Sequence, residues 1–229
     1  MSMSKRYVIV SSISCFVSSA FVALFCFLIT VGNIDLNIIA NPTAGIKAAL
    51  VAVMLQCTVS AMGLSLLFPD QFSFLSSKDS KVHFQVLNAL KSGLILALSC
   101  TLFYGLAVCY GAPVYAKTAE TFHFAALLTC LVCFPCCLLV GSSKEALGRI
   151  FFLDSSDVGL ETVVLVTSVC SLLGAWLGAI PIPLDWDRPW QEWPVSCSLG
   201  ALGGYTIGLF LVAIYLPRRY KFILKSKFT

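Results

Sequence analysis

The side chains best suited to chemistry in this sequence are a few carboxylates and one imidazole. Asp185, Asp187 and Glu192 fall in one short stretch, and Glu120 and His123 are three residues apart, which places both on one face of a helix. Carboxylates with an imidazole can hold a divalent cation or transfer protons. Such residues more often mark the point where a membrane helix meets the lipid headgroups. We therefore predict a surface role, and keep a catalytic or metal site as the alternative.

Cysteines offer a second candidate site. Cys133 and Cys136 have the spacing of a metal or redox pair, but they stand inside an apolar segment, where Cys usually packs as a small apolar residue. Acylation of Cys136 or Cys137 is a further alternative. A disulfide between Cys109 and Cys197 stays open. On balance we predict no catalytic residue, no cofactor and no metal ligand.

The acidic stretch belongs to an unusual segment, residues 181–194, which we call the tryptophan loop. It contains four of the nine prolines and three of the four tryptophans of the chain. Pro189 fits the first turn of a short helix that Asp187 would cap, and such a helix would place Trp190 and Trp193 on one face. Trp favours the boundary between water and lipid. We predict contacts with lipid, glycan or protein for Asp185, Trp186, Asp187, Arg188, Trp190, Glu192 and Trp193.

The elements that position this loop are membrane helices. The 229 residues are 59% hydrophobic and 11% charged, far from the composition of soluble domains. Because the hydrocarbon core offers the backbone no hydrogen-bond partners, each span takes about 20 apolar residues as a helix. The sequence predicts a single all-α integral membrane domain with six transmembrane helices at residues 7–31, 48–68, 92–115, 121–140, 162–180 and 195–216. Residues 82–91 would form a short helix in the interface before the third span.

Charge indicates the orientation. Of the 15 Lys and Arg residues, 12 lie in the two termini and in the connections 68–92 and 140–162. The positive-inside rule therefore predicts cytosolic termini, a cytosolic basic tail at residues 217–229 and a tryptophan loop on the opposite side. Lys225 and Lys227, close to the C-terminus, resemble the dilysine signal that returns membrane proteins to the endoplasmic reticulum. These basic residues are scattered over the two termini and two connections, a distribution that argues against nucleic acid binding.

Small residues at four-residue steps predict close helix packing. Gly174 and Gly178 form such a face before the loop, and Gly200, Gly204 and Gly208 form one after it. Helices in lipid associate through close backbone approach, so this stripe would bind either the neighbouring helix or a partner protein. A similar line in the third span is Gly93, Ala97, Thr101, Gly105 and Cys109. Gln56, near the middle of the second span, predicts an interhelical hydrogen bond.

The run from Gly174-Ala175-Trp176-Leu177-Gly178-Ala179 through the tryptophan loop to Gly200-Ala201-Leu202-Gly203-Gly204-Tyr205 resembles the signature of the PIG-F family of glycosylphosphatidylinositol (GPI) anchor biosynthesis. The resemblance implies a multi-pass protein of the endoplasmic reticulum membrane without catalysis of its own. It also implies two partners, the PIG-O and PIG-G type transferases. These enzymes move ethanolamine phosphate from phosphatidylethanolamine onto mannoses of the GPI precursor in the lumen.

Two other functions stay open at this point. The chain could itself modify lipid headgroups with Glu120, His123, Asp185, Asp187 and Glu192. It could also be a small lipid transporter or scramblase. Transporters usually carry an intramembrane charge or paired broken helices, whereas the spans here contain only Gln56 and Pro135 as unusual residues.

Overall fold

The computed structural model describes residues 5–32, 35–69, 82–141 and 159–227. This part of the chain is helical and contains no strand. Its helices are α1 (Lys5–Val31), α2 (Pro42–Leu67), α3 (Val82–Cys109), α4 (Thr118–Leu139), α6 (Leu160–Ala179), the 3₁₀ helix η2 (Pro189–Gln191) and α7 (Val195–Lys227). All six α-helices named here are long and apolar enough to cross a membrane. The prediction of an all-α, multi-pass membrane protein is confirmed.

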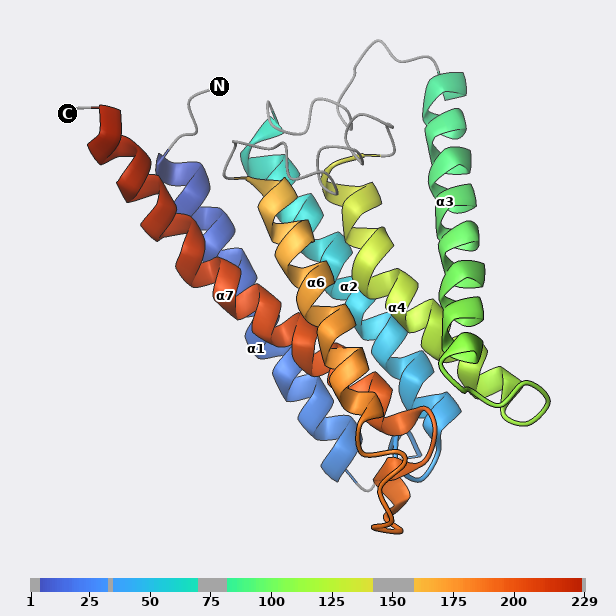
Figure 1. The fold of residues 1–229 in the computed structure, drawn as a ribbon. Helices are drawn as coiled ribbons and strands as arrows, with labels where there is room; N and C mark the ends of the chain where they lie inside the picture. The colour runs from blue at the N-terminus through green and yellow to red at the C-terminus, as the bar shows by residue number, and fades with distance from the viewer. Residues whose placement is uncertain (1–4, 33–34, 70–81, 142–158, 228–229) are drawn as a thin grey trace.

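The helices form one bundle around α4, α6 and α7 (Figure 1). Helix α7 packs along α6 and α1, while α4 contacts α2, α3 and α6. In an apolar 18-residue stretch of each helix, 56% of α4 and 50% of α7 is buried inside the bundle. The corresponding share of α3, which stands at the edge of the bundle, is only 6%. Buried Leu127 and Leu131 of α4 and Leu202 of α7 lie in the core.

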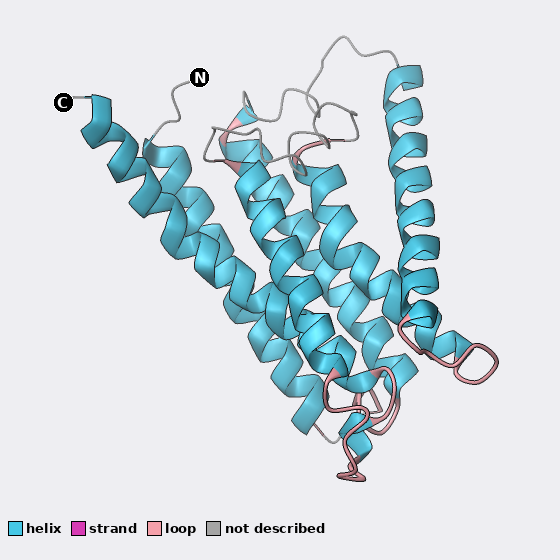
Figure 2. Ribbon diagram, in the orientation of Figure 1, coloured by secondary structure: helices cyan, strands magenta, loops and turns pink. Residues whose placement is uncertain are grey.

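Helix α1 begins and α7 ends at the same end of the bundle, and the tryptophan loop lies at the other end (Figure 1). Figure 2 shows that residues 110–117 form a loop at this second end as well. The relative placement of termini and loop therefore agrees with six crossings. Lys78, Lys81, Lys144 and Arg149, which enter the charge count, lie outside the described residues.

Helix α3 differs from the predicted third span at both ends. It begins at Val82, so residues 82–91 continue directly into the span and do not form a separate helix. It ends at Cys109 and not at residue 115, because Gly111 adopts a positive φ of 101°, a conformation that glycine reaches without steric cost. Val114 and Tyr115 are apolar and therefore lengthened the predicted span, but they lie in the loop between α3 and α4.

Helix α7 runs past the predicted end of the sixth span and includes most of the predicted tail. It continues through Pro217 to Lys227. Proline has no N–H to donate to the carbonyl four residues earlier, which here is Ala213. The hydroxyl of Ser12 on α1 donates a hydrogen bond to that carbonyl. This bond compensates for the missing donor and allows an unbroken helix.

Candidate functional site

The glycines of α6 and α7 bring the two helices into backbone contact. A Cβ built on Gly174 would overlap the carbonyl oxygen of Gly200, and one on Gly178 would overlap that of Ser196. A Cβ on Gly208 would lie 2.9 Å from Cα of Thr167. The sequence did not decide whether this glycine stripe binds a neighbouring helix or a partner protein. In the structure it faces the neighbouring helix. The tryptophan loop connects these two tightly packed helices.

Gln191 fixes the shape of the tryptophan loop from inside. Its side chain is buried, and its Nε2 donates to the carbonyl oxygens of Pro181 (2.7 Å) and Leu184 (2.9 Å). Its Oε1 accepts from the backbone N–H of Arg188 at 2.9 Å. Sequence reasoning missed Gln191. Its position three residues after Arg188, the residue that precedes the short helix, is the spacing of a capping box and was the signal that could have identified it.

The predicted short helix is present, but its details differ. It comprises Pro189–Gln191, and Arg188 precedes it at the cap position that was predicted for Asp187. Asp187 instead has a positive φ of 47° and turns the chain ahead of the helix. Because η2 ends at Gln191, it cannot place Trp190 and Trp193 on one helical face.

The three tryptophans of the loop have different surroundings. Nε1 of Trp193 donates to Oγ1 of the buried Thr121 on α4 at 2.9 Å, and its ring meets Phe124 edge-on at 5.3 Å. Trp190 is half-buried and its ring centroid lies 6.0 Å from that of Trp186, which is 56% exposed. Trp193 therefore anchors the loop to α4, whereas Trp186 faces outward.

Charged residues of the loop lie on the surface. Glu192 forms an ion pair with Lys117, at the start of α4, while Asp185, Asp187 and Arg188 are exposed. An exposed pair of this kind contributes at most about 1 kcal/mol. It connects the tryptophan loop to the loop 110–117, and neither Lys117 nor Thr121 was singled out from the sequence.

The candidate acidic site does not assemble. Within the described residues, which include Glu120, His123, Asp185, Asp187 and Glu192, no three His, Cys, Asp or Glu side chains come close enough to hold a metal ion. Glu192 pairs with Lys117, and Nδ1 of His123 is hydrogen-bonded to the carbonyl of Ala119 on its own helix.

The cysteines show no pairing. Cys109 and Cys197 are both free, the first exposed and the second buried. Cys133 and Cys136 are free as well, and Sγ of Cys133 donates to Oγ of Ser99 on α3 at 3.2 Å. These contacts are those of helix packing.

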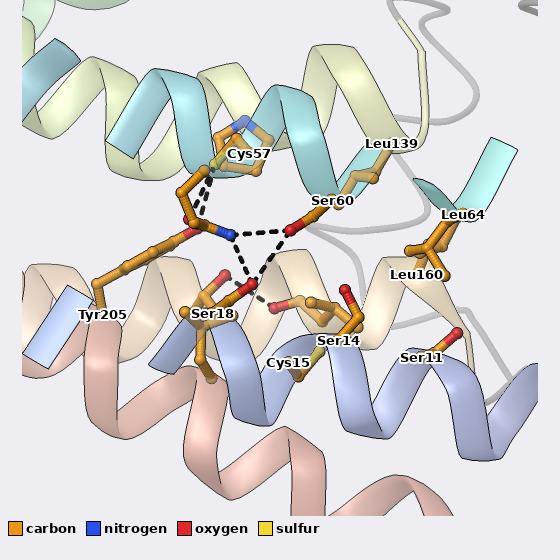
Figure 3. A pocket seen from close by; sticks show the side chains of 15 residues that line it. Ser11, Ser14, Cys15, Ser18, Cys57, Ser60, Leu64, Leu139, Leu160 and Tyr205 are labelled. Atoms are coloured by element: carbon orange, nitrogen blue, oxygen red, sulfur yellow. Dashed lines mark hydrogen bonds between the residues drawn. The ribbon is translucent and has the colours of Figure 1, made fainter. Parts of the chain in front are cut away.

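A polar cluster that includes Ser18, Ser60 and Tyr205 lies inside the bundle (Figure 3). Gln56 joins its three helices, α1, α2 and α7. Its Nε2 donates to Oγ of Ser18 on α1 at 2.8 Å, and its Oε1 accepts from Oη of Tyr205 on α7 at 3.3 Å. The predicted interhelical hydrogen bond of Gln56 is confirmed. An adjoining cavity of about 40 Å³ is lined by Gln56, Tyr205, serines, Thr167 and apolar side chains, and none of the described residues that line it is charged.

The two lysines that resemble a retrieval signal lie at the far end of α7. Lys225 is exposed, and Lys227 is the last residue of the helix. The tryptophan loop and these two lysines therefore stand at opposite ends of the bundle.

Comparison with known proteins identifies the family of this chain. The model of the GPI biosynthesis protein family Pig-F matches residues 9–213, which is most of the chain. The chain belongs to the PIG-F family. No solved structure matches it.

Among the relatives of this PIG-F family chain are two mammalian proteins named "GPI ethanolamine phosphate transferase, stabilizing subunit". The one from Mus musculus is 42% identical over 142 residues, and the one from Homo sapiens is 41% identical over 141 residues. Each match covers 62% of this chain, and it spans 65% of the mouse protein and 64% of the human protein. The glycosylphosphatidylinositol anchor biosynthesis protein 11 of Debaryomyces hansenii is 33% identical over 174 residues, 72% of each chain.

Proposed function

We propose that this chain is a non-catalytic stabilising subunit of the ethanolamine-phosphate transferases of GPI-anchor synthesis. The observation that carries the proposal is the family match over residues 9–213, together with the names of the mammalian relatives. The catalytic partners would be transferases of the PIG-O and PIG-G type. They would transfer ethanolamine phosphate from phosphatidylethanolamine to mannoses of the GPI precursor.

The chain would lie in the endoplasmic reticulum membrane with both termini in the cytosol and the tryptophan loop in the lumen. The charge distribution of the sequence supports this orientation. Lys225 and Lys227 would act as the retrieval signal, at the end of the bundle where α7 finishes. In the lumen, the outward-facing Trp186, with Asp185, Asp187 and Arg188, would contact the transferase, the glycan or lipid.

Helix α3 is the best candidate for docking a membrane helix of the transferase. Its small-residue line, Gly93, Ala97, Thr101, Gly105 and Cys109, is exposed along its whole length. A Cβ built on Gly93 or Gly105 would meet no atom within 4 Å. In contrast to the glycines of α6 and α7, this face is therefore open to close approach by another helix.

Purification in a mild detergent, followed by mass spectrometry of the accompanying proteins, tests the proposal. We expect a large ethanolamine-phosphate transferase in near-equal amount. Gly105→Leu should lower its recovery, while Gly63→Leu on α2, another glycine with open space around its Cβ, should not. A chain that purifies alone would contradict the subunit role. Equal recovery with the two variants would contradict only the docking face on α3.

A further inference from the structure

A groove between α1 and α2 is not used by anything described above. It has a volume of about 570 Å³, within the range of sites that hold small molecules. Ala44, Ala48 and Ala52, at four-residue steps on α2, leave the space open, and Phe21 and Phe25 of α1 border it. Small side chains opposite bulky ones thus create a long apolar groove on the outside of the bundle.

The groove has the depth of one membrane leaflet. Along α2 it extends from Ala44 to Leu55, which corresponds to about 17 Å of helix. Half of the hydrocarbon core is about 15 Å. The same face of α2 continues with Val59 and Met62, which are 61% and 63% exposed and do not line the groove. A helix that crosses the whole membrane would need a groove that continues past Leu55.

A single charge lies at the shallow end of the groove. Lys47 is exposed, and among the described residues it is the only charged one that lines the groove. It stands five residues after Pro42, where α2 begins, and so at the end of the groove nearer the membrane surface. The apolar lining of the groove favours a hydrocarbon chain, and the positive charge of Lys47 at its shallow end favours a phosphate.

We propose that the groove binds one phospholipid, in the leaflet that faces the same end of the bundle as the tryptophan loop. One acyl chain lies against Ala48, Ala52 and Leu55, and the phosphate contacts Lys47. This site does not depend on the proposed transferase and can be tested on the purified chain alone.

The test uses the full chain in nanodiscs of phosphatidylethanolamine with a phosphatidylcholine probe that carries a photoactivatable diazirine in one acyl chain. After irradiation, the adducts are mapped by mass spectrometry. We expect adducts on the groove residues of α1 and α2. Ala48→Trp should fill the groove and remove them, and Lys47→Gln should lower them, because the phosphate would lose its charged contact. Val59→Trp, on the same face beyond the groove, should leave them unchanged.

Equal labelling of Ala48→Trp and Val59→Trp would overturn the proposal, because the lipid would then be general annular lipid. Unchanged labelling of Lys47→Gln would overturn the part assigned to the phosphate, and this exposed substitution remains informative if the tryptophan variant does not fold. Labelling in nanodiscs but not in native membranes would also overturn the proposal, since a protein would then cover the groove.

Discussion

Gly204→Ala should destabilise this protein, whereas Gly203→Ala, one residue earlier on the same helix, should not. A Cβ on Gly204 would overlap the carbonyl oxygen of Cys170 and lie 2.8 Å from its carbonyl carbon. Both are backbone atoms of α6, so no change of rotamer can relieve the overlap. A Cβ on Gly203 would meet nothing within 4 Å.

The size of the effect follows from this geometry. To accommodate the new methyl group, α6 and α7 must separate locally by about 1 Å, which forfeits a quarter to a half of each dispersion contact at that point. Overpacking of this kind costs about 1–3 kcal/mol. Ala in place of Gly favours the helix by about 1 kcal/mol in both variants, so this gain cancels in the comparison. We therefore expect the two variants to differ by about 1–3 kcal/mol.

Thermal denaturation of the purified chain in detergent, followed by size-exclusion chromatography of the remaining monodisperse protein, measures the difference. Gly204→Ala should lose monodisperse protein at a lower temperature than the wild type. Gly203→Ala should match or exceed the wild type. If Gly204→Ala were as stable as Gly203→Ala, the close contact between α6 and α7 would be refuted.

Three further substitutions test the anchoring of the loop and of α7. Trp193→Phe should keep the edge-on contact with Phe124 but lose the hydrogen bond to Thr121, which lowers the stability by about 1 kcal/mol. Trp193→Ala removes both contacts, so it should lower the stability further in the same thermal assay. Gln191→Ala should make the tryptophan loop more sensitive to protease, because three hydrogen bonds that close the loop are lost; an unchanged cleavage rate would contradict this. Ser12→Ala should lower stability by about 1 kcal/mol by leaving the carbonyl freed by Pro217 without its donor, and a neutral result would show that this bond is dispensable.

The sequence was sufficient for the features that follow from local chemistry. Hydropathy located all six of the long apolar helices in the described part of the chain, because a backbone in hydrocarbon must form a continuous helix. Glycine spacing identified the residues that bring α6 and α7 together, and the depth of Gln56 required a partner. Each of these features depends on residues within a few helical turns of one another or on a single polar side chain.

The sequence was not sufficient where the outcome depends on how distant segments meet. Thr121 and Trp193 are 72 residues apart, so their hydrogen bond follows from the packing of the loop on α4. The compensation of Pro217 needs Ser12 from the opposite end of the chain, so the continuation of α7 beyond Pro217 does not follow from local sequence. Likewise, the groove at Lys47 exists only because Phe21 and Phe25 of α1 border the alanines of α2.

The central claim is that this chain stabilises an ethanolamine-phosphate transferase. The most direct measurement is the abundance of that transferase in cells after rapid depletion of this chain, with re-expression of the wild-type chain as the control. We predict that transferase protein falls while its messenger RNA does not, and that GPI precursors without ethanolamine phosphate accumulate. A transferase that keeps its abundance and half-life after complete depletion would contradict the account.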